Sequence, residues 1–262
     1  MKFKDKVVVV TGGARGIGYA TALLSAREGA CSVVCDLDPD GVEAAVKAIR
    51  ATGATALGVV GDVSDRSSVA ENVAHVIAEF GRIDVLVNNA ATQVPAPARE
   101  LTEDHWRREL DVCLTGTFFW SQIAAVESMI PRRSGVIVNV GSGAGLAAAP
   151  NTASYVAAKH GIVGLTKALA VDWGQYDIRV NCVCPGFTWT ELARSVSEAR
   201  PEMMKERVSR IPLGSGAQPE DVANAVCFLA SAESAAVSGS VLSVDGGTSA
   251  LSSGYSAPRD GT

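Results

Sequence analysis

A tyrosine and a lysine, Tyr155 and Lys159, stand four positions apart in the stretch ASYVAAKHG, which otherwise holds mostly small residues. On a helix, residues four apart lie on one face, one turn from each other, so the two side chains can act together. A phenol, with an ordinary pKa of about 10, is a poor base at neutral pH unless a neighbouring cation favours the phenolate. The pair therefore predicts a tyrosine that exchanges a proton with a substrate oxygen and a lysine that assists it.

A second group of residues predicts a nucleotide site near the N-terminus. The stretch VVVVTGGARGIG runs from a strand pattern into a helical one, with Gly12, Gly16 and Gly18 at the turn. Glycines let the backbone turn sharply and approach a pyrophosphate, whose charge the free N–H groups and the dipole of the next helix can meet. A tight turn without a ligand is the alternative for this motif alone.

An acidic residue strengthens the nucleotide interpretation. Asp36 closes the second predicted strand about twenty residues further on, where a carboxylate can accept hydrogen bonds from an adenosine ribose. That carboxylate would repel a 2′-phosphate. Arg15 argues for NADP, but Leu37 supplies no second cation, so we predict NAD as the cofactor.

The elements that must position these residues alternate along the chain. Consecutive apolar residues, which are typical of parallel strands buried on both faces, are followed by stretches of helical period. We therefore predict a single α/β domain over residues 1–249, a Rossmann-type doubly wound parallel sheet of about seven strands. The expected strands are 7–11, 31–35, 55–60, 83–88, 135–140, 179–184 and 241–244, and the expected helices are 17–28, 39–52, 66–80, 103–130, 153–173 and 219–231.

Two segments depart from this alternation. Residues 187–216 place a long, charged and partly helical segment between the last two strands, which predicts a substrate lid. The tail, residues 250–262, is rich in Gly, Ser and Pro. We expect it to have little order unless a neighbouring subunit binds it.

Composition excludes several classes of function. The net charge is -5 and the 23 Lys and Arg residues are dispersed, so we expect no nucleic-acid partner. No apolar run has the length of a membrane span or of a signal-peptide core, so we expect a cytoplasmic protein. The six cysteines lie in apolar stretches and the three histidines are scattered, which predicts free buried thiols and no metal site.

Taken together, the motifs resemble those of the short-chain dehydrogenase/reductase family. The resemblance covers nearly the whole chain up to about residue 249, and the combination of motifs is highly specific. Thr11-Gly12-x3-Gly16-x-Gly18 is followed in order by Asp62-Val63, Asn88-Asn89-Ala90-Ala91, Ser142, Tyr155-x3-Lys159, Asn181, Pro185-Gly186 and Val244-Asp245-Gly246-Gly247.

The resemblance implies roles for the matching residues. Ser142, which by itself is more often a turn residue, is implied to hydrogen-bond the substrate oxygen beside Tyr155 and Lys159, and these last two also contact the cofactor. The other residues expected to bind the cofactor are Gly12, Gly16, Ile17 and Gly18 for the pyrophosphate, Arg15 in the same loop, which could serve NADP, Asp36 and Leu37 for the ribose, Asp62 and Val63 for the adenine, Asn89, Ala90 and Ala91 for the adenosine side, and Pro185, Gly186, Thr188 and Thr190 for the nicotinamide.

One position departs from the family pattern. Cys113 stands three residues before Gly116, where the family usually has an asparagine. That asparagine is thought to hold, through its main-chain carbonyl in a distorted helix, a water that relays protons to the lysine. Either the relay survives through the backbone of Cys113, which we expect, or the proton path is altered and turnover falls. A catalytic thiol is not expected, because no base stands beside it in sequence.

The predicted substrate pocket is mostly small or apolar, which favours a small or cyclic secondary alcohol or its ketone. Several lid cations hint at an acidic substrate, but the glutamates between them make a solvated helix face the stronger interpretation. The pocket residues are Gln93, Val94, Gly143, Ala144, the range 149–152 with Thr152, Phe187, Trp189 and Leu192; the cations are Arg194, Arg200, Lys205, Arg207 and Arg210.

The leading interpretation is an NAD-dependent alcohol dehydrogenase or ketone reductase. An NADPH-dependent 3-oxoacyl thioester reductase is the first alternative, with Asp36 against it. Nucleotide-sugar epimerases and dehydratases share Tyr-x-x-x-Lys but usually add a C-terminal sugar domain, for which we expect no room. A non-catalytic nicotinamide-sensing protein is disfavoured by the retained Ser142, Tyr155 and Lys159.

Apolar surface on helices 105–130 and 153–173 predicts that these helices pair subunits and that the protein is a homotetramer.

Overall fold

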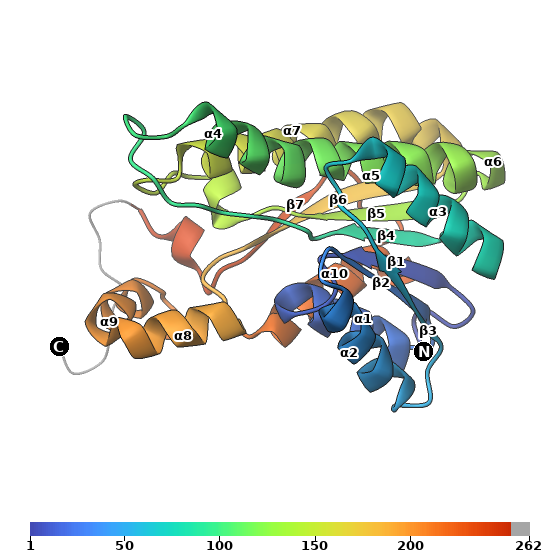
Figure 1. Cartoon of the computed structure of the whole chain (residues 1–262), viewed down its shortest axis with the longest axis horizontal. Helices are drawn as coiled ribbons and strands as arrows, with labels where there is room; N and C mark the ends of the chain where they lie inside the picture. Colours follow the sequence, from blue (N-terminus) through green and yellow to red (C-terminus); the bar gives the residue numbers. More distant parts are fainter. Residues whose placement is uncertain (253–262) are drawn as a thin grey trace.

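A seven-stranded parallel sheet forms the centre of the computed structural model (Figure 1). Its order is β3-β2-β1-β4-β5-β6-β7, so the order reverses between β1 and β4, where open α/β sheets bind ligands at their carboxyl ends. The predicted doubly wound sheet is confirmed, and every strand lies within about two residues of its predicted bounds. The strands are β1 (Val7–Thr11), β2 (Cys31–Asp36), β3 (Ala56–Val60), β4 (Val85–Asn88), β5 (Gly135–Val140), β6 (Ile178–Pro185) and β7 (Val241–Val244).

Helices cover both faces of the sheet. On one face lie α1 (Gly16–Arg27), α2 (Pro39–Arg50) and α10 (Pro219–Ala230), and on the other α3 (Arg66–Phe80), α5 (Gly116–Ala124) and α7 (Ala153–Trp173). Strand β1 shows why its apolar residues are consecutive. Val8 and Val10 pack into the core on the α1 side, whereas Val7 and Val9 pack into the core on the α3 side.

The long helix predicted over 103–130 is present but is not a continuous α-helix. Two π-helical segments, η1 (Asp111–Thr115) and η2 (Ala125–Met129), separate α4 (Glu103–Leu110), α5 and α6 (Ile130–Arg132). In η2 the Ile130 N–H bonds to the Ala125 carbonyl, five residues back. Pro131 follows directly; it lacks an N–H and its ring crowds the preceding turn, so the wider π turn accommodates it.

The predicted lid segment forms two short helices, α8 (Glu191–Ala199) and α9 (Pro201–Ser209), beyond the carboxyl ends of the strands (Figure 1). The structure describes residues 1–252, apart from the side chain of Leu192. Most of the predicted tail, residues 253–262, lies outside the described residues. Short 3-10 turns complete the chain: η3 (Gly143–Gly145), η4 (Gly174–Tyr176), η5 (Ala232–Ser234) and η6 (Thr248–Ala250).

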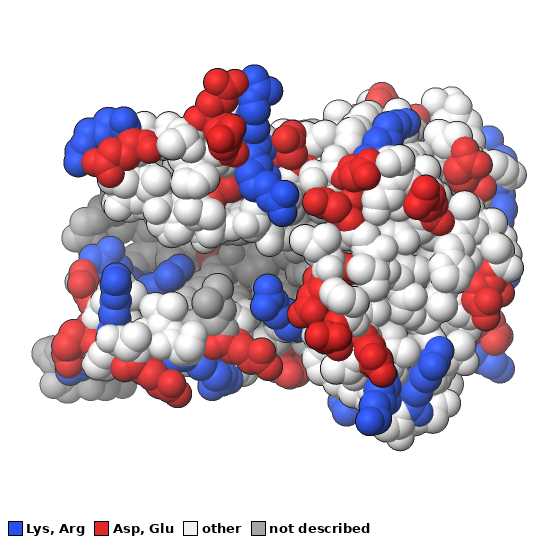
Figure 2. Space-filling model, in the orientation of Figure 1, with Lys and Arg blue, Asp and Glu red and all other residues white. Residues whose placement is uncertain are grey.

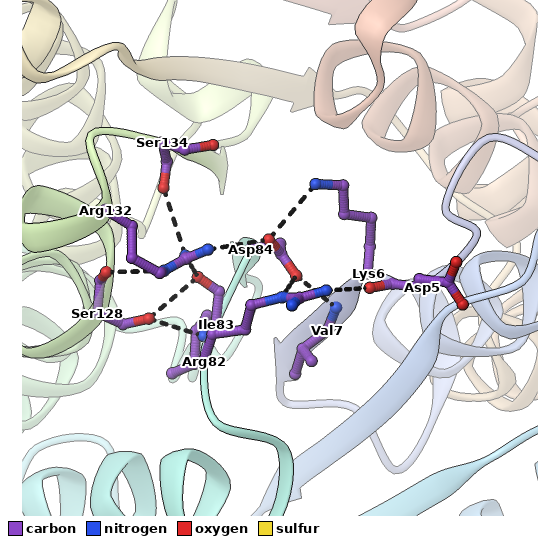
Figure 3. A network of polar contacts seen from close by, with 9 residues as sticks. All are labelled: Asp5, Lys6, Val7, Arg82, Ile83, Asp84, Ser128, Arg132 and Ser134. Atoms are coloured by element: carbon purple, nitrogen blue, oxygen red, sulfur yellow. Dashed lines mark hydrogen bonds and ion pairs between the residues drawn. The ribbon is translucent and has the colours of Figure 1, made fainter.

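At the amino end of β4, a buried carboxylate joins several segments (Figure 3). Asp84, 5% exposed, accepts hydrogen bonds from the Val7 N–H at 2.9 Å and from Arg82 Nε at 2.8 Å, and pairs with Arg132 at 3.2 Å and Lys6 at 3.5 Å. Burial alone would raise the pKa of Asp84, but the N–H group and the cations together hold it below the ordinary value. This network fastens β1, β4 and α6 to one another.

Two further expectations concern the whole chain. All six cysteines are free, and five of them are buried, which confirms the predicted free thiols. Among the described residues, no helix is both long and apolar enough to cross a membrane.

Candidate active site

Helix α7 places the tyrosine and the lysine at the carboxyl end of β5. Lys159 is only 2% exposed, and its Nζ donates a hydrogen bond to the carbonyl of Val140, the last residue of β5, at 2.8 Å. The same Nζ lies 5.5 Å from the centroid of the Tyr155 ring, which is partly exposed. The predicted spacing on one helical face is therefore present, with a buried cation beside an accessible phenol.

Ser142 follows the same strand end. Its hydroxyl oxygen accepts a hydrogen bond from the Ala144 N–H at 3.1 Å and so caps the turn η3. Gly145 in that turn lies directly on α7, because a Cβ there would be 2.7 Å from the Lys159 carbonyl oxygen. The contact holds the turn after Ser142 against the helix that carries Tyr155 and Lys159, so the structure brings the three predicted catalytic residues to one strand end.

The glycine loop crosses the carboxyl end of β1. Gly12 and Gly16 have φ values of +60° and +56°, which favour glycine, and a Cβ on Gly12 would lie 2.8 Å from Ala90 Cα. Helix α1 has no side-chain cap and no acidic residue in its first turn. Its uncapped N–H groups and open backbone fit the anionic pyrophosphate of a dinucleotide.

Asp36 ends β2 and turns toward that loop. One carboxylate oxygen accepts a hydrogen bond from the Ala14 N–H at 3.1 Å, and the other accepts one from the Leu37 N–H at 2.8 Å. The Leu37 side chain itself is 57% exposed, and Arg15 is exposed at the start of α1. The loop and the strand end thus place an acidic residue where the ribose of a bound dinucleotide is expected.

The segment after β4 is fastened to the glycine loop. The Asn89 amide nitrogen donates to the carbonyls of Thr11 and Gly12, at 3.0 and 2.9 Å. In return the Thr11 hydroxyl oxygen accepts from the N–H groups of Asn89 and Ala90, at 3.0 and 3.1 Å. Asn89 therefore holds the loop in shape, a role that the sequence analysis did not assign to it.

Asp62 and Val63, which are expected to contact the adenine of the cofactor, follow β3. Asp62 accepts hydrogen bonds at one carboxylate oxygen from the N–H and the hydroxyl of Ser64, at 2.9 and 2.6 Å. Val63 is buried against α5, where a Cβ on Gly116 would lie 2.8 Å from the Val63 carbonyl oxygen. Of the pair, Asp62 alone has a polar side chain, and its other carboxylate oxygen lies 3.9 Å from the Arg108 guanidinium.

The segment after β6 runs in front of the glycine loop. Its backbone leaves β6 at Pro185, and the Gly186 N–H bonds to the Val244 carbonyl at 2.9 Å. The Thr190 methyl group lies 3.4 Å from where a Cβ on Gly16 would be, so this segment and the loop face each other. The Thr188 and Thr190 hydroxyls bond within their own segment, to the Gly186 carbonyl and the Ala193 N–H.

The residues expected to line the substrate pocket are only partly brought together. Phe187 and Trp189 form an edge-to-face pair with centroids 4.7 Å apart, at the base of the lid. The Thr152 hydroxyl turns instead into a local bond with the Ala149 carbonyl at 2.7 Å, and Gln93 is exposed. Figure 2 shows a deep hollow between the α8–α9 lobe and the lobe that carries α4 and α7.

Cys113 lies in the π segment η1 and is fully buried. Its thiol donates to the Thr92 carbonyl at 3.4 Å, and its own carbonyl accepts a bond from the Thr117 hydroxyl at 2.7 Å. Burial raises the pKa of the Cys113 thiol, although Lys159 acts in the opposite direction. A neutral buried thiol is a poor nucleophile, which supports the expectation of no catalytic thiol.

Sequence reasoning missed a buried acid beside this position. Glu109 in α4 is 1% exposed and accepts a hydrogen bond from the Ser154 hydroxyl at 2.5 Å and another from the Val94 N–H. Ser154 directly precedes Tyr155, and Val94 belongs to the predicted pocket. The signal was available, because Glu109 stands four residues before the inward-facing Cys113 on the same helical face.

A buried amide network, also missed, holds the helices around the site. The Asn88 amide donates to the Ser121 hydroxyl and to the Asn139 side-chain oxygen, both at 2.9 Å. The Asn139 amide in turn donates to the Thr166 hydroxyl in α7 at 2.9 Å. This network ties α5 and α7 to β4 and β5, and so sets the position of the helix that carries Tyr155 and Lys159.

Comparison with known proteins agrees with this arrangement. A family model described as enoyl-(acyl carrier protein) reductase matches residues 12–249. The 3-oxoacyl-(acyl-carrier-protein) reductase of Thermotoga maritima is 40% identical over 248 residues, which cover 94% of this chain and 99% of that protein. The cis-4-hydroxycyclohexanecarboxylate dehydrogenase of Sinomonas cyclohexanicum is 42% identical over 251 residues, covering 95% of this chain and 98% of that protein.

Solved structures share the whole fold. An NAD+-bound xylitol dehydrogenase superposes with a TM-score of 0.90 at 31% identity, covering 94% of this chain and 100% of that one. A structure from Beutenbergia cavernae, assigned as an NAD(P)-dependent gluconate 5-dehydrogenase with NADP bound at low occupancy, has a TM-score of 0.89 at 37% identity and covers 96% of this chain and 100% of that one. The two structures hold different nicotinamide cofactors on the same fold.

Proposed function

The chain belongs to the short-chain dehydrogenase/reductase family of oxidoreductases, and we propose that it is an NAD-dependent enzyme that interconverts a small or cyclic secondary alcohol and its ketone. The observation that carries the proposal is the Tyr155–Lys159 pair at the end of β5, held beside Ser142. The glycine loop crosses the end of β1, which β4 separates from β5, on the same carboxyl edge of the sheet.

Each of the three residues has a separate task. Tyr155 takes the hydroxyl proton of the alcohol, or returns it to the ketone oxygen in the reverse direction. The ammonium group of Lys159, 5.5 Å from the centroid of the Tyr155 ring, stabilises the negative charge that develops on the Tyr155 oxygen as the proton is transferred. The Ser142 oxygen already accepts the Ala144 N–H, so its own O–H is left to donate to the substrate oxygen.

The cofactor would lie along the glycine loop, with Asp36 at its ribose and Thr188 and Thr190 at its nicotinamide end. NAD held there would supply the hydride acceptor for the alcohol carbon, and NADH the hydride donor in the reverse direction. Asp36 supports NAD because its carboxylate faces the loop, where a 2′-phosphate would be repelled. Arg15, exposed at the start of α1, is the one loop residue that favours NADP.

Cofactor titration tests this choice. We expect wild-type protein to have a kcat/KM for NAD at least about tenfold above that for NADP, and Asp36→Ala to reduce the ratio by about tenfold or more. Arg15→Gln serves as the matched control, because it should weaken only the residual use of NADP. An unchanged ratio in Asp36→Ala would contradict the assignment of NAD through Asp36.

Turnover is tested with a panel of secondary alcohols, dihydrodiols, hydroxysteroids and polyols, by following NADH formation. We expect at least one of these to be oxidised, and Tyr155→Phe to lower kcat by about 10³-fold while the protein stays folded. The Phe variant keeps the ring over Lys159 and removes only the hydroxyl. A Phe variant with near-wild-type kcat would rule out this mechanism.

A second candidate function is supported by the Thermotoga maritima relative, which is named as a 3-oxoacyl-(acyl-carrier-protein) reductase. It predicts NADPH-dependent reduction of acetoacetyl-CoA by the same Tyr155 and Lys159. Asp36 disfavours it. The second candidate would be selected if kcat/KM is higher with NADPH than with NADH and higher for this thioester than for every alcohol of the panel.

We also propose a single domain over residues 1–249, a cytoplasmic location and a homotetramer. Exposed apolar side chains on the two helices predicted to pair subunits support the assembly of a tetramer. Val171 on α7 is 80% exposed, Val126 in η2 is 51% exposed and Trp106 on α4 is 39% exposed. Light scattering at micromolar concentration should give the mass of four subunits. A monomeric mass would contradict the tetramer.

A further inference from the structure

One lid cation lies against the predicted substrate pocket. Arg207 belongs to α9, and its guanidinium carbon stands over the Phe187 ring, 4.8 Å from the centroid. Phe187 comes two residues after Pro185, the end of β6, and packs edge-to-face on Trp189. A residue twenty positions along the chain is thus folded back onto the strand end that faces the glycine loop.

Two other lid arginines have acceptors of their own. Arg210, the C-cap residue of α9, forms an ion pair with Glu206 in that helix. Arg194 in α8 donates to the Gln218 side-chain oxygen at 2.7 Å. Within residues 1–252, no carboxylate or other oxygen acceptor bonds to the Arg207 guanidinium, which has five N–H donors to satisfy.

The surroundings of Arg207 suit a bound anion. Arg207 is exposed, but packing against the Phe187 ring removes part of its hydration and lowers the pKa of Arg207, although a guanidinium remains charged at neutral pH. Figure 2 shows Lys and Arg side chains at the edge of the α8–α9 lobe that faces the hollow. A carboxylate can accept two parallel N–H bonds from a guanidinium, and the Phe187 ring offers an apolar wall for the carbon frame next to it.

From these observations we infer that Arg207 recognises a carboxylate group on the substrate, so that the alcohol oxidised at Tyr155 is a small hydroxy acid and its product an oxo acid. The inference rests on the proposed function, because it assigns the substrate class of the same site. It departs, for this one residue, from the interpretation of the lid cations as a solvated helix face. The competing structural interpretation is that Arg207 only holds α9 onto Phe187.

Binding of two isosteric probes separates these interpretations without turnover. Cyclohexanecarboxylate carries the charge, and cyclohexanecarboxamide has the same shape without it. Each is titrated by calorimetry into the full chain saturated with NADH, at low ionic strength. We expect the wild type to bind the carboxylate at least about tenfold more tightly than the carboxamide.

Matched variants locate the preference. Arg207→Gln should weaken carboxylate binding about tenfold or more and carboxamide binding less than about twofold, whereas Arg207→Lys should retain part of the preference. Arg210→Gln is the control. It removes the same charge from the end of the same helix, but from a residue that is already paired with Glu206. It should change neither affinity by more than about twofold.

Three outcomes would overturn the inference. The first is a wild-type protein that binds the two probes with equal affinity or binds neither. The second is an Arg207→Gln variant whose affinities for the two probes fall by the same factor. The third is an Arg210→Gln variant whose affinity for the carboxylate falls as much as that of Arg207→Gln. The proposed function fails in a different way, through absent turnover or an active Tyr155→Phe. Because Tyr155→Phe should still prefer the carboxylate, the two failures are distinguishable.

Discussion

The two edges of the central sheet each bury a charged side chain, but only the charge at the amino edge is surrounded by opposite charges. At the amino edge, Asp84 is 5% exposed and is surrounded by Arg82, Arg132 and Lys6 as well as by the Val7 N–H. At the carboxyl edge, Lys159 is 2% exposed, and the contacts offered to its ammonium by the described residues are the Val140 carbonyl and the Tyr155 ring.

The difference separates a structural charge from a chemical one. A buried ion stabilises a fold only when opposite charges and hydrogen bonds compensate for the water it has lost, and Asp84 has both. Lys159 has one hydrogen bond and no counter-ion among the described residues, so its burial costs stability. A fold that retains such a charge keeps an electrostatic field at the site, which the phenol of Tyr155 uses in the proposed mechanism.

The largest expected effect tests this distinction at the carboxyl edge. Lys159→Met keeps the length of the side chain and removes its charge. We expect kcat to fall by about 10³-fold, because the phenolate loses its cation, while the melting temperature stays the same or rises. Turnover and thermal unfolding are measured on the same sample. A melting temperature several degrees lower would show that Lys159 is a structural charge after all.

The second effect tests the amino edge. Asp84→Asn leaves three partly exposed cations without their buried counter-ion, and we expect the free energy of unfolding to fall by about 2–3 kcal/mol. The kcat of the folded fraction should change less than about twofold. Asp65→Asn, an exposed carboxylate at the start of α3, is the control and should have little effect on stability. Equal losses in both variants would mean that the network around Asp84 adds nothing.

The third prediction follows from the lowered pKa of Asp84. A carboxyl group whose pKa is lower in the folded than in the unfolded state contributes stability above its unfolded pKa and loses that contribution as the pH falls through its folded pKa. Between about pH 5 and pH 2, wild-type stability should therefore fall more steeply than that of Asp84→Asn. Urea unfolding at a series of pH values measures both slopes. Parallel slopes would contradict the assigned shift.

The smallest effect concerns Glu109, a buried carboxylate near the site that accepts one N–H and one O–H bond and forms no ion pair with another residue of 1–252. In Glu109→Gln only the amide oxygen can accept, so either the Val94 N–H loses its acceptor or the Ser154 hydroxyl must turn and accept from the amide nitrogen. We expect kcat/KM to fall by about tenfold, mainly in kcat, because Ser154 precedes Tyr155. Ser154→Ala should have a similar effect, and the double variant should lose little more. Additive losses would mean that the contact does not position Tyr155.

Local sequence patterns predicted much of the fold. The valine run of β1, the glycines that open α1 and the alternation of helices with strands depend on neighbours in the chain, and their bounds were found within a few residues. The resemblance implied a distorted helix at Cys113, where η1 lies, but the helical pattern over 103–130 predicted neither π segment, and η2 depends on how Pro131 is accommodated within one long helix. The start of β4 was placed two residues early. The Ile83 backbone bonds to the Ser128 hydroxyl, whereas the Asp84 backbone still bonds to Val7 and Val136 of the neighbouring strands.

The sequence by itself determined the identity of the candidate catalytic residues, because Tyr155 and Lys159 are one helical turn apart and the glycine loop is a local motif. Only the tertiary structure decided what surrounds them. Glu109 is buried and accepts hydrogen bonds from Val94 and Ser154, which are distant in the sequence. Arg207 packs against the ring of Phe187, twenty positions earlier in the chain. Burial, charge compensation and free donors are properties of contacts between distant segments, and the spacing of residues along the chain does not specify them.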